Sequence, residues 1–523
     1  MHVIARVAAL AALFLLSLGF SASAQDVQLR SLDGTIELSG SLIGFDGEYY
    51  RVETVFGPLT VSAQGVTCRG PGCPDLENFV AEVRFAGSPV IAEQLLPALI
   101  ARFAATRDMA LRRQILADNR SLFALVRNEG EDTEQIAARF YVTSTTTDAG
   151  LQALLDRDTD IALAAREPDA AEAEAARAAD QGDLSMVSRS RVLALDALVP
   201  LVAPANPVEA LSLEDLARLF AGEITNWQDL GGPDAPVILH LPDDTLGQGQ
   251  DVALRILAPF DRVAAPSVIR HMDAGDLADA VARDPFAIGI GSFAHPGNAR
   301  IVPLRGTCGF TQHATTESLK AEDYPLTSPL LLYLPVRRMP VLVRDFLSFF
   351  ESQEADRVIR RLGFVNQDIA TLTLAEQGLR LANAVEAAGE DVSLEDLQTL
   401  VAAMRGAERL SPTLRFEEGT TELDAQSLAA ISRLARAIER GEFDGRELVF
   451  VGFSDGQGGA EANLRLSRGR AETVRLAVMA AAAEGDLNRV RLRVAGFGEA
   501  LPMACDDTAA GRAVNRRVEV WLR

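Results

Sequence analysis

The chain has 523 residues and a formal net charge of -23. This length predicts roughly two to four domains, each large enough to bury a core. Because binding to nucleic-acid phosphates requires clustered cations, the acidic charge argues against nucleic acid as a partner. The four cysteines and five histidines are scattered and form no pattern typical of a zinc site, so we expect no metal.

Residues 1–24 have the three parts of a secretory signal peptide. Arg6 precedes an apolar run over residues 7–20, and Ala22 and Ala24 supply small residues at its end. The run of about 14 residues is shorter than the roughly 20 that span a bilayer. We therefore expect export to the periplasm, with a mature chain that begins at Gln25 and has no membrane span. A buried or membrane helix is the alternative.

Residues 25–77 are expected to form a small β module. Apolar residues alternate along 26–66, and Asp-Gly pairs at 33–34 and 46–47 separate the runs, which is typical of hairpins. Cys68 and Cys73 then flank a Gly- and Pro-rich turn. A disulfide between them suits an oxidising compartment. A metal site is the alternative, but no second Cys/His pair accompanies these cysteines.

Strand and helix signals alternate over residues 78–368. We expect strands at 79–85, 160–164 and 197–202, a helix over 88–105, and a helix that Ser212 caps and that ends at Phe220. Alternation of this kind predicts parallel sheets with ligand sites at the strand ends.

This segment resembles periplasmic substrate-binding proteins of the phosphate-binding (PstS-like) type. The resemblance rests on 85–88 (FAGS), 143–150 (TSTTTDAG), 219–232 (LFAGEITNWQDLGG), 286–289 (FAIG) and 363–365 (GFV). It implies a type II periplasmic-binding-protein fold, in which a cleft separates two α/β lobes. It also implies a small anion, such as phosphate, held by backbone N–H groups and hydroxyls at helix N-termini.

The resemblance implies six anion-binding residues: Ser88, Ser144, Thr145, Asp160, Thr245 and Gly247. Each hydroxyl residue alone would more often be an ordinary helix cap. The family's Ser-Gly-Thr contact is altered, because Leu246 and Gln248 replace its hydroxyl residues, and Ala165 replaces a usual serine. Each lost hydroxyl would cost about 1–3 kcal/mol in a dry anion site. Phosphate, another anion and no ligand therefore all stay open.

Residues 369–410 are expected to form a helical connector, with Ser393 capping its second helix. Residues 411–523 follow with a buried strand at 447–453, a turn, a long helix from Asn463, and a strand at 490–494. A last strand begins with Arg516 and Arg517.

This C-terminal segment resembles the OmpA-like family of peptidoglycan-binding domains. The matching motifs are 452–455 (GFSD), Asn463 with 466–471 (LSRGRA), 496–499 (GFGE) and 515–519 (NRRVE). The resemblance implies an α+β fold that binds the diaminopimelate stem peptide of peptidoglycan without catalysis. The expected chain is thus a multidomain α/β protein located at the peptidoglycan, near the outer membrane.

The resemblance assigns the peptidoglycan-binding residues Asp455, Arg470, Asn463, Ser454 and Arg516. A carboxylate and a guanidinium on two rigid elements would pair with the ammonium and carboxylate of diaminopimelate. Alternatively, Asp455 and Arg470 pair only with each other, Asn463 only orders its loop, and Arg516 or Arg517 is structural. Phe453 replaces a common histidine of the family.

The sequence is compatible with three functional classes. The first is a non-catalytic solute-binding protein tethered to the cell wall, and the second is a structural envelope protein with a vestigial cleft. The third is an enzyme, which we do not expect, because the chain has no nucleophile elbow, metal cluster or Walker-type loop. No cofactor is expected. Cys308 and Cys505 either form an interdomain disulfide or are two buried free thiols.

Overall fold

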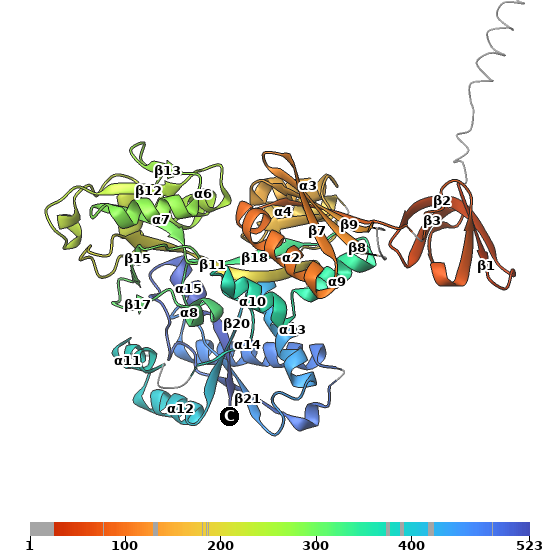
Figure 1. Ribbon diagram of the computed structural model, residues 1–523. Helices are drawn as coiled ribbons and strands as arrows, with labels where there is room; N and C mark the ends of the chain where they lie inside the picture. Colours follow the sequence, from red (N-terminus) through yellow and green to blue (C-terminus); the bar gives the residue numbers. More distant parts are fainter. Residues whose placement is uncertain are drawn as a thin grey trace, which may run out of the picture. The chain divides into compact units, whose positions relative to one another are not determined.

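The computed structural model describes residues 26–523 except 77, 129–133, 180, 185, 187, 373–376, 388–391, 417–422 and 484. The expected signal peptide, residues 1–24, lies outside the described residues. The chain divides into two units. Unit 1 contains residues up to 82, 124–139 and 337–347, and unit 2 contains the rest (Figure 1). No helix among the described residues is long and apolar enough to cross a membrane.

Unit 1 contains a five-stranded antiparallel sheet, as the alternating residues predict. Its order is β4-β3-β2-β1-β5. The strands are β1 (Val27–Ser31), β2 (Glu37–Phe45), β3 (Tyr49–Thr54), β4 (Gly57–Ser62) and β5 (Val66–Arg69). Tyr50 and Val52 are fully buried in its small core. Cys68 and Cys73 lie at disulfide distance after β5, with their Cα atoms 5.8 Å apart.

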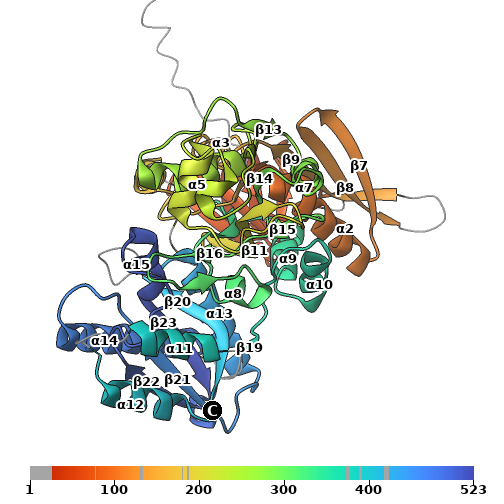
Figure 2. The same cartoon turned by 90° about the vertical axis from the view of Figure 1, so that its left-hand side faces the viewer.

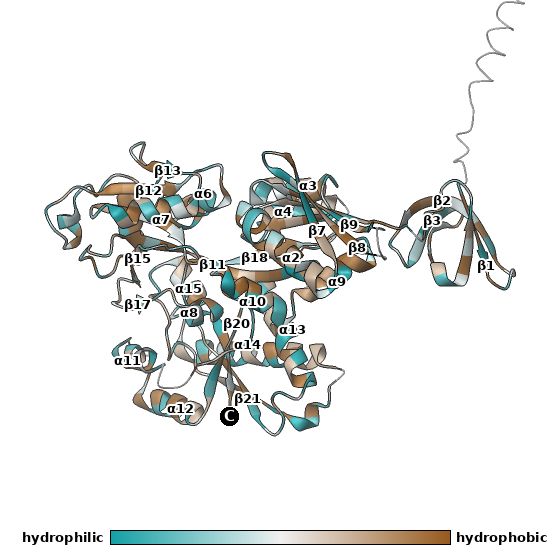
Figure 3. Cartoon of the chain, in the orientation of Figure 1, coloured by the Kyte–Doolittle hydropathy of each residue, from teal (hydrophilic) through white to brown (hydrophobic). Residues whose placement is uncertain are grey.

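A lobe that belongs mostly to unit 2, here called lobe 1, has strands that join one large sheet; its residues 124–139 and 341–347 fall in unit 1. Its elements are β6 (Ala81–Gly87), α2 (Leu96–Thr106), β7 (Ala110–Ala117), β8 (Arg120–Asn128), β9 (Glu134–Ser144), α3 (Thr147–Leu155), β10 (Ile161–Ala164), α4 (Ala170–Ala178), β11 (Ser190–Val202), β18 (Thr327–Tyr333), α9 (Val341–Phe349) and α10 (Gln353–Arg361). The helix expected over 88–105 begins with a π-helical turn, Val90–Leu95. The strand drawn at the labels β11 and β18 is largely brown, and thus hydrophobic, in Figure 3.

Lobe 2 is built on the other end of the same sheet. Its elements are α5 (Leu213–Phe220), β12 (Ile238–Pro242), α6 (Gly247–Val252), β13 (Ile269–His271), α7 (Ala274–Arg283), β14 (Ala287–Ser292), β15 (Arg300–Ile301), β16 (Leu304–Arg305), β17 (Thr311–Gln312) and α8 (Thr316–Lys320). Ser212 and Asp215 form the expected capping box of α5. Trp227 and Phe220 lie at the centre of the lobe 2 core.

The large sheet is mixed, which corrects the expectation of parallel sheets. Its order is β13-β12-β14-β11-β18-β10-β6-β9-β8-β7. β10 is parallel to β6, and β12 is parallel to β13 and β14. However, β18 is antiparallel to β10 and β11, and β11 is antiparallel to β14. The reason is that β11 carries the chain from lobe 1 into lobe 2 and β18 carries it back.

The C-terminal part of unit 2 has the sheet order β19-β20-β23-β21-β22. Its elements are β19 (Thr371–Leu372), α11 (Gly378–Ala387), α12 (Leu394–Met404), β20 (Glu408–Arg415), α13 (Ala425–Glu439), β21 (Glu447–Gly452), α14 (Ala460–Ala481), β22 (Arg491–Gly496), α15 (Ala509–Asn515) and β23 (Arg517–Leu522). The helices of this part can be followed in Figure 2.

The expected helical connector contributes to this C-terminal part as well as leading into it. Residues 371–372 form β19, and β20 already begins at Glu408, so both ends of the segment are strands. Leu400 and Met404 of α12 pack against Val451 and Trp521 on one face of the sheet. α13 and α14 cover a second core that contains Phe450. The sheet is therefore enclosed by helices on both faces.

Candidate functional site

Close backbone packing brings α14 against the ends of β21 and β22. A Cβ on Gly452 would lie 1.9 Å from the carbonyl oxygen of Ser467, and one on Gly496 would lie 2.6 Å from the backbone nitrogen of Arg468. Only glycine fits at such distances. The turn after β21 therefore sits beside the helix that carries Arg470.

Asp455 and Arg516 form an ion pair at this corner of the domain. The Arg516 Nη1 donates to Asp455 Oδ2 at 2.9 Å, and the two side chains are only 14% and 13% exposed. The turn after β21 supplies the carboxylate, and the residue between α15 and β23 supplies the guanidinium. Asp455 thus pairs with Arg516 rather than with Arg470.

Arg470 lies beside this pair with one donor unused. Its Nη1 is buried and has no hydrogen-bond partner among the described residues. Its guanidinium lies 5.4 Å from the centroid of the Phe416 ring. Burial lowers the pKa of Arg470, the nearby Arg516 cation lowers it further, and Asp455 opposes both effects. A buried cation with a free N–H group is a natural partner for an incoming carboxylate.

Ser454 and Asn463 complete the expected set at the same corner. The Ser454 hydroxyl is buried and has no partner among the described residues, while its N–H donates to Gly498 O at 2.8 Å. The Asn463 amide donates to Glu499 Oε2 at 3.2 Å, which orders the loop after β22. The structure therefore brings all five residues together.

Phe453 and Arg517, unlike the five residues of the candidate peptidoglycan site, lie in the core. Both side chains are fully buried, and the Arg517 guanidinium lies 4.3 Å from the centroid of the Phe453 ring. Arg517 also donates from Nε to Glu519 Oε1 at 2.8 Å. Of the two arginines in the 515–519 motif, Arg516 pairs with Asp455 and Arg517 pairs with Glu519 in the core.

Three of the tentative anion-binding residues lie together at the ends of β6 and β9. The Ser88 N–H donates to Leu163 O at 2.9 Å, and the Thr145 N–H donates to Gly87 O at 2.8 Å. Gly87 has a φ of 138°, and a Cβ there would lie 2.0 Å from Leu163 O. The Ser144 hydroxyl, however, donates to the Glu93 carboxylate at 2.5 Å.

Asp160 and Thr245 each bond to another protein side chain. Asp160 precedes β10 and pairs with Arg84 at 3.0 Å, at the end of the parallel strands opposite to Ser88. The Thr245 hydroxyl donates to Asp243 Oδ1 at 2.5 Å. The structure therefore separates Asp160 from Ser88 and Thr145, and an acidic side chain occupies the Thr245 hydroxyl.

The two lobes approach each other where Gly247 begins α6. A Cβ on Gly247 would lie 3.9 Å from Thr147 Oγ1, at the start of α3. Asp251, one turn further along α6, is 6% exposed. Burial raises the pKa of Asp251 to about 6, Arg255 and Arg166 oppose this rise, and Asp148 adds to it. A buried carboxylate that the expected site did not include thus lies one helical turn from Gly247.

Arg166 acts electrostatically on Asp251, and protein carboxylates already bind it. It donates to both oxygens of Glu172, at 2.7 and 2.9 Å, and to Asp148. Sequence reasoning noted the altered residue before this arginine but missed the carboxylates around it. The spacing of Asp148, Arg166 and Glu172 gives no such signal, because α3, β10 and α4 bring them together.

No group of three or more metal-ligating side chains occurs among the described residues. Both candidate sites consist of charged, amide and hydroxyl groups suited to holding a polar ligand.

Comparisons with known proteins match the two parts separately. Residues 114–354 match the sequence profile of the PBP superfamily domain, and residues 415–516 match that of the OmpA family. Phosphate-binding protein PstS of Borreliella burgdorferi is 22% identical over 188 residues, which are 35% of this chain and 67% of that protein.

The C-terminal part has its own relatives. Outer-membrane lipoprotein YfiB of Pseudomonas aeruginosa is 31% identical over 111 residues, which are 21% of this chain and 62% of that lipoprotein. The chain thus spans less than two thirds of its length. Among solved structures, an ABC-type phosphate transport receptor from Vibrio cholerae has a TM-score of 0.41 and 18% identity, covering 54% of this chain and 99% of that one. One part of the chain is therefore similar to PBP superfamily domains, and a second part is similar to OmpA family domains.

Proposed function

We propose that this chain is a non-catalytic periplasmic protein that its C-terminal domain anchors to peptidoglycan. The PBP superfamily domain would then be held at the cell wall as a solute-binding module. The expected signal peptide would direct export to the periplasm. The intact mass of the exported protein should then correspond to a chain that begins at Gln25.

The observation that carries the anchoring proposal is the buried, unused Nη1 of Arg470 beside the Asp455–Arg516 pair. Asp455 already pairs with Arg516, whereas the buried Nη1 of Arg470 has no acceptor among the described residues. A ligand group with both an ammonium and a carboxylate would satisfy Asp455 and Arg470 together. The side-chain end of diaminopimelate has this chemistry.

Co-sedimentation of the full chain with diaminopimelate-type peptidoglycan tests the proposal. Asp455→Ala and Arg470→Ala should each weaken binding roughly ten- to hundredfold, because each removes a charge-assisted contact. Arg465→Ala is the matched control, since Arg465 is an exposed arginine of the same helix that pairs with Glu461. If both site variants sediment like the control, these residues do not form the site.

A second candidate, a structural envelope protein with an empty cleft, is supported by the contacts around Arg166. Glu172 and Asp148 occupy its guanidinium, and acidic side chains accept the hydroxyl protons of Ser144 and Thr245. A phosphate would have to displace these carboxylates and enter beside Asp251. High-affinity phosphate binding is therefore not part of the proposal.

Calorimetric titration of the full chain with inorganic phosphate separates the two candidates. The structural candidate predicts no heat and no thermal shift at millimolar phosphate. Saturable micromolar binding would overturn it and establish an anion receptor. Sulfate serves as the matched probe, because it has a similar size and no proton to donate to a carboxylate.

A further inference from the structure

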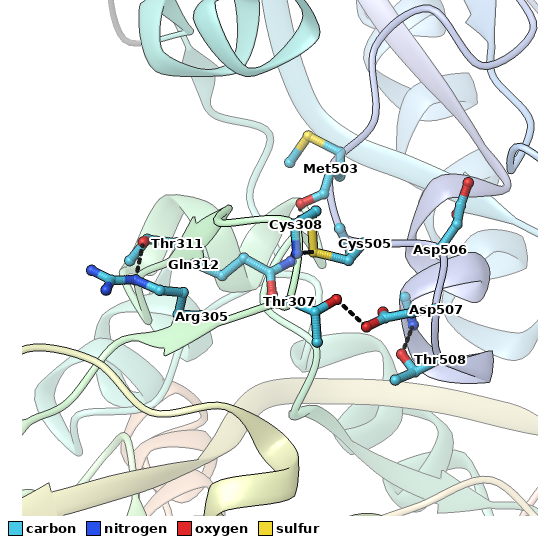
Figure 4. The surroundings of a disulfide bond; sticks show 12 residues. Arg305, Thr307, Cys308, Thr311, Gln312, Met503, Cys505, Asp506, Asp507 and Thr508 are labelled. Atoms are coloured by element: carbon cyan, nitrogen blue, oxygen red, sulfur yellow. Dashed lines mark hydrogen bonds between the residues drawn. A yellow bond between two sulfur atoms is a disulfide. The ribbon is translucent and has the colours of Figure 1, made fainter. Parts of the chain in front are cut away.

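Residues 503–507, here called the bridging loop, connect lobe 2 to the C-terminal domain. The Gln312 amide donates to Met503 O at 3.1 Å, Cys505 forms a disulfide with Cys308, and the Thr307 hydroxyl donates to the Asp507 carboxylate (Figure 4). Every second residue of the loop is thus bonded to the 305–312 segment of lobe 2.

The intervening residues of the bridging loop are bonded to the proposed peptidoglycan site. Ala504 exchanges two hydrogen bonds with the Asn515 amide, at 3.0 and 2.8 Å. Asp506 Oδ2 accepts from the Gly456 N–H at 2.6 Å, and Asp506 Oδ1 accepts from Asn515 Nδ2 at 2.7 Å. Gly456 follows Asp455, and Asn515 precedes Arg516. Asp506 therefore holds the two segments that carry the ion pair.

The bridging loop has little room to move without disturbing these segments. A Cβ on Gly511 would lie 1.8 Å from Cys505 O, so α15 packs directly on the loop backbone. A Cβ on Gly456 would lie 2.8 Å from Asp506 Oδ2. A displacement of Cys505 would thus reach both α15 and the turn after β21.

We propose that the bridging loop positions the peptidoglycan site, with Asp506 as the positioning residue and the Cys308–Cys505 bond to lobe 2 as its support. This inference rests on the proposed function of the C-terminal domain. Reduction of the bond by a dithiol converts both cysteines to thiols while the dithiol becomes a disulfide. The freed loop then has to be ordered when the ligand binds, which weakens binding.

The test is calorimetric titration of the full oxidised chain with a diaminopimelate-containing stem tripeptide. Reduction with dithiothreitol and the Cys308→Ser/Cys505→Ser variant should each raise Kd roughly two- to tenfold, the cost of ordering a loop. Cys68→Ser/Cys73→Ser is the matched control. It lacks the other disulfide, and it should bind like the unmodified protein and stay sensitive to reduction.

Asp506 is tested with the disulfide intact, so that a folding defect of the cysteine variant cannot decide the result. Asp506→Ala should raise Kd about tenfold, because a charge-assisted bond to the Gly456 N–H is lost. Asp506→Asn keeps an acceptor oxygen and should recover part of the affinity. In an Asp455→Asn background, reduction should have no further effect.

Equal Kd values for the oxidised protein, the reduced protein and Asp506→Ala would overturn the inference while leaving the anchoring proposal standing. Absence of binding by the oxidised protein would overturn both. If reduction still lowers the affinity of Asp455→Asn, the inference about the bridging loop is also overturned, because the loop would then act on a site other than the one that contains Asp455.

Discussion

At the scale of residues, a fully buried carboxylate organises the C-terminal domain. Glu519 accepts from Arg517 at 2.8 Å and from the Trp521 indole at 3.0 Å, and it pairs with Arg380. Burial raises the pKa of Glu519, but three guanidinium groups, those of Arg380, Arg409 and Arg517, together lower it below the usual range. The negative charge of Glu519 offsets part of the free-energy cost of burying these guanidinium groups.

Removal of this carboxylate should destabilise the fold strongly. Glu519→Ala leaves buried guanidinium groups without a counter-charge, so the free energy of unfolding should fall by about 3–5 kcal/mol. The matched control is Glu472→Ala, which removes an exposed partner of Arg475 on α14 and should cost under about 1 kcal/mol. Urea denaturation compares the two, and equal losses would contradict the proposed role of Glu519.

The sequence motifs identify some residues of the two candidate sites but not how these residues pair. Asp455 and Arg470 belong to motifs that can be read from the chain, and the structure places them at one corner. The pairing of Asp455 with Arg516 and the linkage through Asp506 could not be read, because they depend on how α15 packs. In the cleft, the altered hydroxyls were visible, but the carboxylates around Arg166 come from α3 and α4 and became neighbours only on folding.

At the scale of elements, local signals predicted the elements better than their pairing. The capped helix ending at Phe220 and the strand over 161–164 occur as expected. The direction of β18 and the strand β20 were missed. β20 contains Pro412 and the charged Arg409, and it is buried only because Asp323 and Glu519 compensate that charge.

The turn after α8 should make stability depend on pH. Burial raises the pKa of Glu322 to about 8, and the nearby Asp424 raises it further, against the effect of Arg415. The folded protein therefore holds this proton more tightly than the unfolded chain. Its contribution to stability is fully present below the ordinary glutamate pKa and is lost as the pH rises towards 8.

Glu322→Gln should remove this part of the pH dependence. Urea midpoints measured at pH 5 and pH 8 should differ less in the variant than in the unmodified protein. Asp244→Asn is a suitable control, because it removes an exposed carboxylate that pairs with Arg270. An unchanged difference between the two midpoints in Glu322→Gln would contradict the assignment.

At the scale of the whole molecule, the C-terminal domain is bonded to both lobes. The Ala425 N–H donates to Glu167 at 3.1 Å, and Arg436 pairs with Glu351 at 3.1 Å, both in lobe 1. Arg409 forms a two-pronged pair with Asp323 of lobe 2, and the Cys308–Cys505 disulfide adds a covalent link. Hinged closure is the usual motion of two-lobed binding proteins. These links would restrict it.

Reduction should therefore loosen the hinge where β11 and β18 cross between the lobes. Hydrogen exchange of peptides spanning 327–333 should become faster in Cys308→Ser/Cys505→Ser than in the oxidised protein. Cys68→Ser/Cys73→Ser should leave these peptides unchanged. Identical exchange in all three proteins would show that the C-terminal domain does not restrain the lobes.

We infer that Asp455 and Arg470 tether the PBP-superfamily-like part of the chain to the cell wall. The most direct measurement is calorimetric titration of the full chain with the diaminopimelate stem tripeptide, compared with a tripeptide that contains lysine instead. We expect saturable binding of the first, a loss of at least about tenfold for the second, and a similar loss in Arg470→Gln. Equal affinity for both peptides, or full affinity in Arg470→Gln, would contradict it.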